Sequence, residues 1–451
     1  MSKLYVVLDL ETTIRNKGDQ AVGKLAAAPY HPDNEIVLCG SGIIASSVEL
    51  KAGRTKDNRP LDVHGTSYSV STGEGFLLRT MSTQGWEGGS DIVLVGQNIK
   101  FDLLWMLREH YAETMEFFKQ GGTIWDTQQA EYLLSGQQEM MIPLSSKHNK
   151  EGEVTRVGLA AKYGGTEKDD RIKEYWDNGV DTSDIPLSEL EEYCQYDLKN
   201  TALVFYGQYK AVLDKSDWAE FEYLLESQMD AIVATTMMEH NGMAFDIDLA
   251  STQAMQIAKE YDAIEAELTD QVQMLFNKNN NTMYPITREV ININSTRQLN
   301  IFLFGGEFKF KAPIGLYTDE GDPVLYKSGI KKGQHKTKIG EITVAVTDYP
   351  TKDRLAPEVL SGLPTTVHGY KLDDAAIDTL VKVCPFSVIV FLEQLKKYRK
   401  LNKDLNTYYL GLIKLVWPTD SCIHGNINHC TTGTGRLSSS NPNQQNISGK
   451  K

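Results

Sequence analysis

Residues 5–12 have the sequence YVVLDLET, and this stretch decides the fold of the first part of the chain. A short apolar run such as Tyr5–Leu10 is typical of a buried strand. Side chains two positions apart in a strand point to the same face, so Asp9 and Glu11 are expected to lie side by side. Two such carboxylates could bind one metal ion or bridge two, although the pattern Asp-x-Glu is also a common tripeptide.

Strand and helix patterns alternate through the first 210 residues. Apolar runs at 36–45 and 92–95 predict two more strands, and apolar residues at helical spacing over 101–118 predict a helix. Asp126-Thr127 is a typical helix N-cap, and Ser188 with Glu191 matches a capping box. This alternation predicts an α/β domain that ends near residue 210.

Two further acidic positions accompany these elements. Asp102, in the sequence Asn98-Ile99-Lys100-Phe101-Asp102, lies where a strand gives way to a helix, a position where aspartate also serves as a helix cap. Asp197 lies four residues after Tyr193 on a predicted helix, so the two side chains share a face. By itself, Asp197 could be a solvated helix residue.

Taken in order, these motifs resemble the three exonuclease motifs of the DEDD superfamily, in its tyrosine-containing branch, over residues 4–205. The resemblance implies a ribonuclease H-like α/β domain with a mixed central sheet and flanking helices. It also implies a 3′→5′ DNA exonuclease in which Asp9, Glu11, Asp102 and Asp197 bind two Mg²⁺ or Mn²⁺ ions. Such hard cations prefer oxygen ligands, and a pair of them stabilises both the attacking and the leaving oxygen of a phosphodiester.

The same resemblance assigns roles to neighbouring residues. Tyr193 would orient the attacking water. Four residues would help to hold a frayed, single-stranded 3′ end: Leu10, Thr12, Asn98 and Phe101. Leu10 and Phe101 fit a hydrophobic core equally well.

The rest of the chain predicts a mainly helical region with one insertion. Long helices are predicted from 214 to 280, with a turn at Asn241-Gly242, and again from Lys371 to Tyr409. The stretch 305–368 is rich in glycine, proline, threonine and valine and predicts short strands and loops. The last thirty residues predict loop or extended chain. The predicted domains are 1–210, 211–304, 305–368 and 369–451.

Four strings in this second part resemble family A DNA polymerases of the DNA polymerase I type. They are MEHNGMAFD at 238–246, NINSTRQL at 292–299, YRKLNK at 398–403 and TGTGRLSSSNPNQQNI at 432–447. The resemblance implies a thumb that binds primer–template duplex and the start of a palm. Basic and amide side chains there suit the minor groove and the sugar-phosphate backbone, although an Arg-Lys pair is also typical of a solvated helix face. The candidate duplex contacts are Arg399, Lys403, Thr432, Arg436, Asn443, Gln445 and Asn446.

In family A polymerases the palm carboxylates and the nucleotide-binding helix follow the last of these strings. The sequence ends at Lys451, four residues past Ile447. The resemblance therefore implies the N-terminal part of a bacteriophage-type polymerase, encoded separately or truncated. Polymerisation would need a C-terminal polymerase polypeptide as partner.

Five lysines gather in the insertion, within twelve residues that contain no acid: Lys327, Lys331, Lys332, Lys336 and Lys338. We expect this element either to grip the duplex or to dock a processivity factor. A solvated lysine-rich loop is the alternative.

Composition sets wider limits. The chain is 41% hydrophobic and 24% charged, as in globular proteins, and its net charge of -14 alone argues against nucleic-acid binding. The phosphate backbone senses local basic groups, however, not the sum. Five cysteines without a C-x-x-C pair predict a reducing, intracellular compartment, and Cys422, His424, His429 and Cys430 fit no standard zinc spacing. The resemblance to a bacteriophage-type polymerase implies the cytoplasm of an infected bacterial cell. No stretch approaches the ~18 apolar residues of a membrane helix, so no membrane partner is expected.

Two other functions remain open. An independent nuclease in repair or RNA processing would leave the 432–447 string unexplained. A non-catalytic subunit that only clamps DNA would have no need of four metal-binding carboxylates.

Overall fold

The computed structural model describes residues 2–15, 17–72, 91–166 and 171–447. Its contacts divide the chain into two units. The first comprises residues 1–247 and 412–451, and the second comprises residues 248–411. Each unit has its own hydrophobic core, which is the basis for describing it separately.

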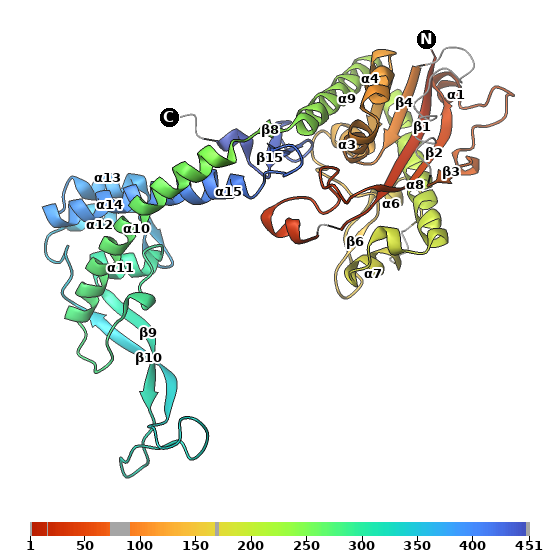
Figure 1. Ribbon diagram of the computed structural model, residues 1–451. Helices are drawn as coiled ribbons and strands as arrows, with labels where there is room; N and C mark the ends of the chain where they lie inside the picture. The colour runs from red at the N-terminus through yellow and green to blue at the C-terminus, as the bar shows by residue number, and fades with distance from the viewer. Residues whose placement is uncertain (1, 16, 73–90, 167–170, 448–451) are drawn as a thin grey trace. The chain divides into compact units, whose positions relative to one another are not determined.

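A five-stranded mixed sheet forms the centre of the first unit, in the order β3-β2-β1-β4-β5 (Figure 1). Strand β1 (Lys3–Thr12) is antiparallel to β2 (Ile36–Ser46) and parallel to β4 (Asp91–Gly96). The edge strands are β3 (Ser69–Ser71) and β5 (Thr123–Asp126). The three strands predicted from apolar runs are confirmed, and those runs are buried because helices cover the sheet.

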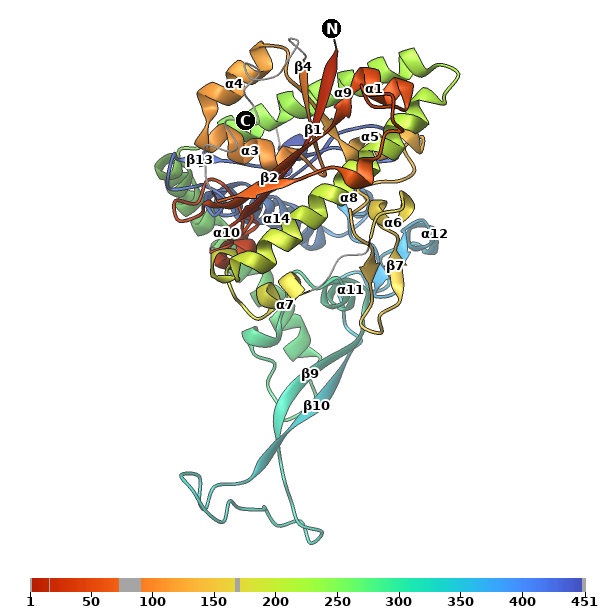
Figure 2. The ribbon, with the colours of Figure 1, turned by 90° about the vertical axis from the view of Figure 1, so that its right-hand side faces the viewer.

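Helices cover both faces of this sheet (Figure 2). Helix α8 (Leu187–Leu213) packs across β1 and β2, whereas α3 (Lys100–Glu109) and α9 (Trp218–Asn241) pack against each other on the other side. The smaller elements of this part are α1 (Ser47–Ala52), α4 (Tyr111–Lys119), α5 (Thr127–Leu134), β6 (Lys147–His148), β7 (Val154–Arg156), α6 (Leu159–Lys162) and α7 (Arg171–Asp177).

Two local predictions were wrong and one is confirmed. The single helix expected over 101–118 is two helices, α3 and α4, because His110 leaves the helical region at φ -138° and ψ 53°. The capping box of Ser188 and Glu191 does not form, because α8 begins at Leu187, directly after its N-cap Pro186, and so two residues earlier than a Ser188 cap requires. Asp126 does cap α5, and its Oδ1 accepts a hydrogen bond from the Gln129 amide at 2.9 Å.

The segment after residue 412 belongs to the first unit and forms short strands, as expected for extended chain. Strand β13 (Cys422–Ile423) pairs with β8 (Met243–Ala244), which follows α9 directly. Strand β14 (Asn426–Asn428) pairs with β15 (Ser438–Ser440). The chain turns sharply at Gly242, where φ is +63°, which confirms the predicted turn at Asn241-Gly242.

The second unit is mainly helical, as predicted. Its long helices are α10 (Ile247–Lys278) and α14 (Phe386–Lys403), with α11 (Thr296–Phe304) and α13 (Asp374–Val381) beside them. The helix expected over 371–409 is interrupted at Pro385 and continues past Lys403 as a π-helical stretch to Tyr409. The helix α15 (Leu410–Ile413) follows.

A long β-hairpin carries the predicted insertion. Strands β9 (Gly306–Gly315) and β10 (Thr337–Val346) pair in antiparallel fashion, and Phe308, Phe310 and Val344 at their base enter the core. The short elements that complete the insertion are α12 (Pro357–Ser361), β11 (Thr365–Thr366) and β12 (Gly369–Tyr370). The prediction of strands and loops over 305–368 is confirmed. Among the helices of the described ranges, none has the length and apolar character needed to cross a membrane.

Candidate metal centre

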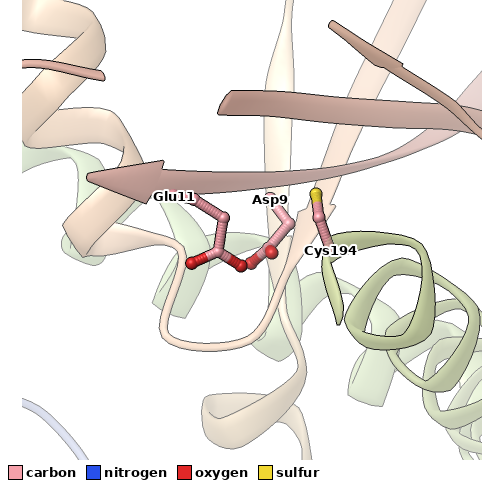
Figure 3. Close-up of side chains that lie close together, drawn as sticks. All are labelled: Asp9, Glu11 and Cys194. Carbon is pink, nitrogen blue, oxygen red and sulfur yellow. The ribbon is translucent and has the colours of Figure 1, made fainter. Parts of the chain in front are cut away.

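Two carboxylates project from one face of β1. Ligand atoms of Asp9, Glu11 and Cys194 all lie within 4.8 Å of one another. Figure 3 shows the carboxylates of Asp9 and Glu11 close together, with the Cys194 side chain of α8 beside Asp9. The prediction that the two acidic residues share a face is confirmed.

Helix α8 brings Tyr193, Cys194 and Asp197 to this pair. The helix approaches closely because Gly40 stands opposite Asp9 in the neighbouring strand β2. A Cβ atom on Gly40 would lie 2.6 Å from both Cys194 Sγ and Leu198 Cδ1. A glycine inside a strand often marks such a close approach, and here it lets α8 rest directly on the sheet.

Replacement of Gly40 with alanine is expected to destabilise the first unit by about 1–3 kcal/mol, because the added methyl group overpacks the interface with α8. Thermal unfolding followed by circular dichroism would measure this loss. Gly18→Ala is the matched control, since a Cβ atom there meets no other atom within 4 Å. Equal unfolding midpoints for the two variants would contradict the packing argument.

Asp102 reaches the same place from the first turn of α3. Its Oδ1 accepts a hydrogen bond from the Leu10 amide at 3.1 Å, and the residue is only 4% exposed. The N-cap of α3 is Ile99, which makes no side-chain capping bond. Asp102 therefore ties α3 to β1 between the two acidic residues of that strand.

Electrostatics connect Asp102 and Tyr193 with the two acidic residues of β1. Burial raises the pKa of Asp102 well above its usual range, and the nearby charge of Asp9 raises it further. Burial also raises the pKa of Tyr193, with added contributions from the charges of Asp197, Glu11 and Asp9. The Tyr193 phenol thus lies in the negative electrostatic field of three carboxylates, those of Asp197, Glu11 and Asp9.

The donor set fits hard divalent cations. Carboxylate oxygens are the ligands that Mg²⁺ and Mn²⁺ prefer. Carboxylates buried together repel one another unless they are protonated or a cation neutralises them. Among the residues that the structure describes, Asp9, Glu11 and Cys194 make the one group of three or more His, Cys, Asp or Glu side chains close enough to share an ion.

The residues predicted to hold a 3′ end differ in exposure. Leu10 and Thr12 are 5% and 6% exposed, and Phe101 is half-buried against the core. Asn98 is exposed, has a left-handed backbone with φ +57°, and lines a small cavity together with Lys100. Of these four, Asn98 is the one that presents a polar side chain to solvent.

Two predicted duplex contacts lie on α14 in the second unit. The Arg399 guanidinium donates a hydrogen bond to the Leu372 carbonyl, and burial lowers the pKa of Arg399. Lys403 is exposed, with its ammonium 5.6 Å from the centre of the Tyr408 ring. Lys403 is thus the more accessible of the two to a phosphate, whereas Arg399 helps to hold α14 against the segment before α13.

The remaining predicted duplex contacts lie in the first unit, on a strip formed by residues 432–446. The Tyr132 hydroxyl donates to the Thr432 carbonyl at 2.7 Å, and Gln445 Nε2 donates to the Leu437 carbonyl at 2.8 Å. These bonds fix the strip to α5 and to itself. The exposed side chains of the strip include the predicted contacts Arg436, Asn443, Gln445 and Asn446, together with Thr434, Leu437 and Asn441.

A buried ion pair that no sequence motif indicates anchors β14, the strand that pairs with β15 of this strip. Lys100 Nζ lies 2.8 Å from Glu239 Oε1, with side-chain exposures of 15% and 2%. Lys100 also donates to the Ile427 carbonyl at 3.0 Å, and the Ile427 amide donates to Glu239. Lys100 lies in the string at 98–102 and Glu239 in the string at 238–246. Neither string indicates that the segment around Ile427 bonds to both residues.

Comparison with known proteins finds a family match in the last part of the chain. Residues 358–451 match the DNA polymerase family A model. The matched region holds α13, α14 and the strip at 432–446, where two of the polymerase-like strings lie. In this region the chain is similar to DNA polymerase I, as the sequence analysis expected.

Relatives support the same assignment. The chain is 27% identical over 352 residues to DNA polymerase I of Synechocystis sp., an alignment that covers 78% of this chain and 26% of that protein. It is 46% identical over 70 residues to DNA polymerase I of Bacillus caldotenax, which covers 16% of this chain and 8% of the relative. The chain thus spans about a quarter or less of the length of these relatives.

A solved structure matches with low similarity. It is the POL domain of Pol1 from M. smegmatis in complex with DNA primer-template and dNTP. The sequence identity is 17% and the TM-score 0.48, with 100% of this chain and 53% of that chain covered.

Proposed function

We propose that the chain is a 3′→5′ proofreading exonuclease with a DNA-binding thumb, and that it forms part of a DNA polymerase I-like family A polymerase. The observation that carries the proposal is the convergence of Asp9, Glu11, Asp102, Asp197 and Tyr193 from three separate parts of the chain. A protein that only clamped DNA would have no reason to bury carboxylates beside one another.

The fold of the first unit supports the nuclease assignment. A central strand has an antiparallel neighbour on one side and a parallel neighbour on the other, in the order β3-β2-β1-β4-β5. We assign this arrangement to the ribonuclease H-like class. The acidic residues stand on β1, near its end at Thr12, and at the start of α3, beside the end of β4.

Each group has a task in phosphodiester hydrolysis. Asp9, Glu11, Asp102 and Asp197 would hold two divalent ions, Mg²⁺ or Mn²⁺, which supply charge stabilisation at the attacking and leaving oxygens. Tyr193 stays a protonated phenol because burial and the surrounding carboxylates raise its pKa, so its hydroxyl can hydrogen-bond the attacking water. Asn98 offers an amide to the frayed 3′ end.

The similarity to DNA polymerase I suggests which substrate the proposed exonuclease would act on. The exposed strip at 432–446 and the exposed Lys403 carry the side chains that suit a sugar-phosphate backbone and a minor groove. The substrate would then be a primer strand whose 3′ end is single-stranded when it reaches the carboxylates.

The test is the release of nucleotides from the 3′ end of single-stranded DNA in Mg²⁺, and its loss when Asp9 and Glu11 are both replaced by alanine. An independent nuclease for RNA would instead degrade an RNA strand of the same sequence at least as fast. A non-catalytic clamp would bind DNA without degrading it.

A second proposal concerns the insertion, whose five lysines, Lys327 to Lys338, are exposed on the loop and strand that follow β9. We infer that they contact duplex phosphates. Each phosphate contact contributes about 0.9 to the slope of log affinity against log salt, so replacing all five lysines with glutamine should reduce the magnitude of the slope by up to about 4.5. Fluorescence anisotropy with a primer–template duplex at several salt concentrations would measure the change.

The matched control removes five exposed lysines from the first unit. These are Lys51, Lys56, Lys119, Lys150 and Lys173. A slope unchanged by the insertion variant would overturn the DNA contact and favour a protein partner, such as a processivity factor, at this loop.

A further inference from the structure

The candidate metal centre contains a sulfur atom that the nuclease chemistry does not use. Cys194 Sγ lies within 4.8 Å of ligand oxygens of both Asp9 and Glu11, and Cys194 is 0% exposed (Figure 3). It stands on α8 between the proposed water-orienting Tyr193 and the proposed ligand Asp197. Neither neighbour explains why a thiol occupies this position.

Packing holds the sulfur beside the carboxylates. Gly40 of β2 faces it so closely that a Cβ atom there would lie 2.6 Å from Sγ. Leu198, one turn later on α8, packs against the same glycine, since its Cδ1 would also lie 2.6 Å from a Cβ atom on Gly40. The thiol is therefore confined between the sheet and the two carboxylates, in a space that no larger side chain on β2 fills.

Ligand chemistry separates two kinds of cation at such a cluster. Mg²⁺ prefers oxygen and keeps its water ligands, whereas Zn²⁺ and Cd²⁺ bind thiolate sulfur together with carboxylate oxygen. We propose that Asp9, Glu11 and Cys194 form a mixed oxygen–sulfur site for a thiophilic divalent cation. When this cation is bound, it keeps the catalytic ion from binding to the same two carboxylates. The inference rests on the proposed function in one respect, since it takes Asp9 and Glu11 as metal ligands.

The required movement is small. Ligand atoms around one tetrahedral Zn²⁺ lie about 3.5 Å apart, given bonds of about 2.0–2.3 Å. Side-chain rotations of Asp9 and Glu11 would bring their oxygens from 4.8 Å or less to that separation. On binding, the sulfur–metal bond replaces the S–H bond, and the proton passes to solvent.

Cadmium provides a direct readout of the sulfur, because a Cd²⁺–thiolate bond absorbs in the ultraviolet and Cd²⁺–carboxylate bonds do not. Titration of the full chain with CdCl₂ should produce this absorption with one equivalent bound. Cys194→Ser should abolish it and weaken Cd²⁺ binding by about 10-fold or more, measured by calorimetry. Added MgCl₂ should shift the Cd²⁺ midpoint of the unaltered chain upward, since both cations need Asp9 and Glu11.

Cys422→Ser is the matched control, because Cys422 is partly exposed whereas the other four cysteines are buried. Absorption that survives in Cys194→Ser, or that disappears only in Cys422→Ser, overturns the inference. If Cys194→Ser fails to fold, the unaltered chain still decides: absence of the absorption, or a midpoint that Mg²⁺ does not move, overturns it. A chain that shows the absorption and the Mg²⁺ competition but degrades no DNA would support the mixed site and refute the proposed nuclease.

Discussion

Replacing Asp9 and Glu11 together with alanine is expected to lower the rate of 3′ nucleotide release by at least about 10³-fold, because each 1.36 kcal/mol of lost transition-state stabilisation costs a factor of ten. These residues are the two carboxylates of the group that is close enough to share an ion, and Glu11 is almost completely buried. Without them the divalent ions lose ligands that hold them at the reacting phosphodiester. A 5′-labelled single strand, resolved at nucleotide resolution in Mg²⁺ and in EDTA, would measure both the rate and the direction of degradation.

The matched control removes two exposed carboxylates from one helix. Glu113 and Glu116 lie on the surface of α4, so the variant Glu113→Ala with Glu116→Ala changes the net charge by the same amount. It should degrade DNA at the unaltered rate. If the Asp9 and Glu11 variant keeps that rate, the proposed function is wrong. If the unaltered chain binds the strand but degrades nothing, the clamp hypothesis takes its place.

Much of the first unit follows from local sequence patterns. The run Tyr5–Leu10 forms β1 because its apolar side chains are covered on both faces of the sheet. The alternation of side chains along that strand correctly predicts that Asp9 and Glu11 share a face. The resemblance to exonuclease motifs adds Asp102, Asp197 and Tyr193, whose role as site residues stays a prediction. In the structure, Asp102 accepts a hydrogen bond from the Leu10 amide, and the charges of Asp197, Glu11 and Asp9 raise the pKa of Tyr193.

Contacts between distant segments were not predictable in this way. Nothing in a periodic pattern shows that Gly40 faces Cys194, because strand pairing and helix docking decide that contact together. The spacing of apolar side chains also does not indicate where these helices begin and end. The backbone conformation of His110 ends α3, and α8 begins directly after Pro186. The return of residues 412–447 to the first unit includes hydrogen bonds between the Ile427 backbone and a buried ion pair, Lys100 with Glu239, which two other segments supply.

That ion pair is the basis of the second large prediction. Replacing Glu239 with alanine should destabilise the first unit by about 3–5 kcal/mol, because it leaves the Lys100 ammonium buried without its carboxylate partner. The Ile427 amide loses its acceptor in the same step. Urea unfolding would measure the loss, and hydrogen exchange would locate it, with faster exchange expected at β14 and β15.

An exposed pair of similar geometry provides the comparison. Arg59 Nη2 lies 3.0 Å from Asp57 Oδ2, and the side chains are 74% and 76% exposed. Asp57→Ala should therefore lower the free energy of unfolding by less than about 1 kcal/mol. Combining Glu239→Ala with Lys100→Met should cost less than the sum of the single changes, since no charge is then left buried alone. Additive effects, or unchanged exchange at β14, would contradict the anchoring role. Because Lys100 stands two residues before Asp102, the same experiment measures how firmly the strip at 432–446 is held to the segment that supplies a proposed metal ligand.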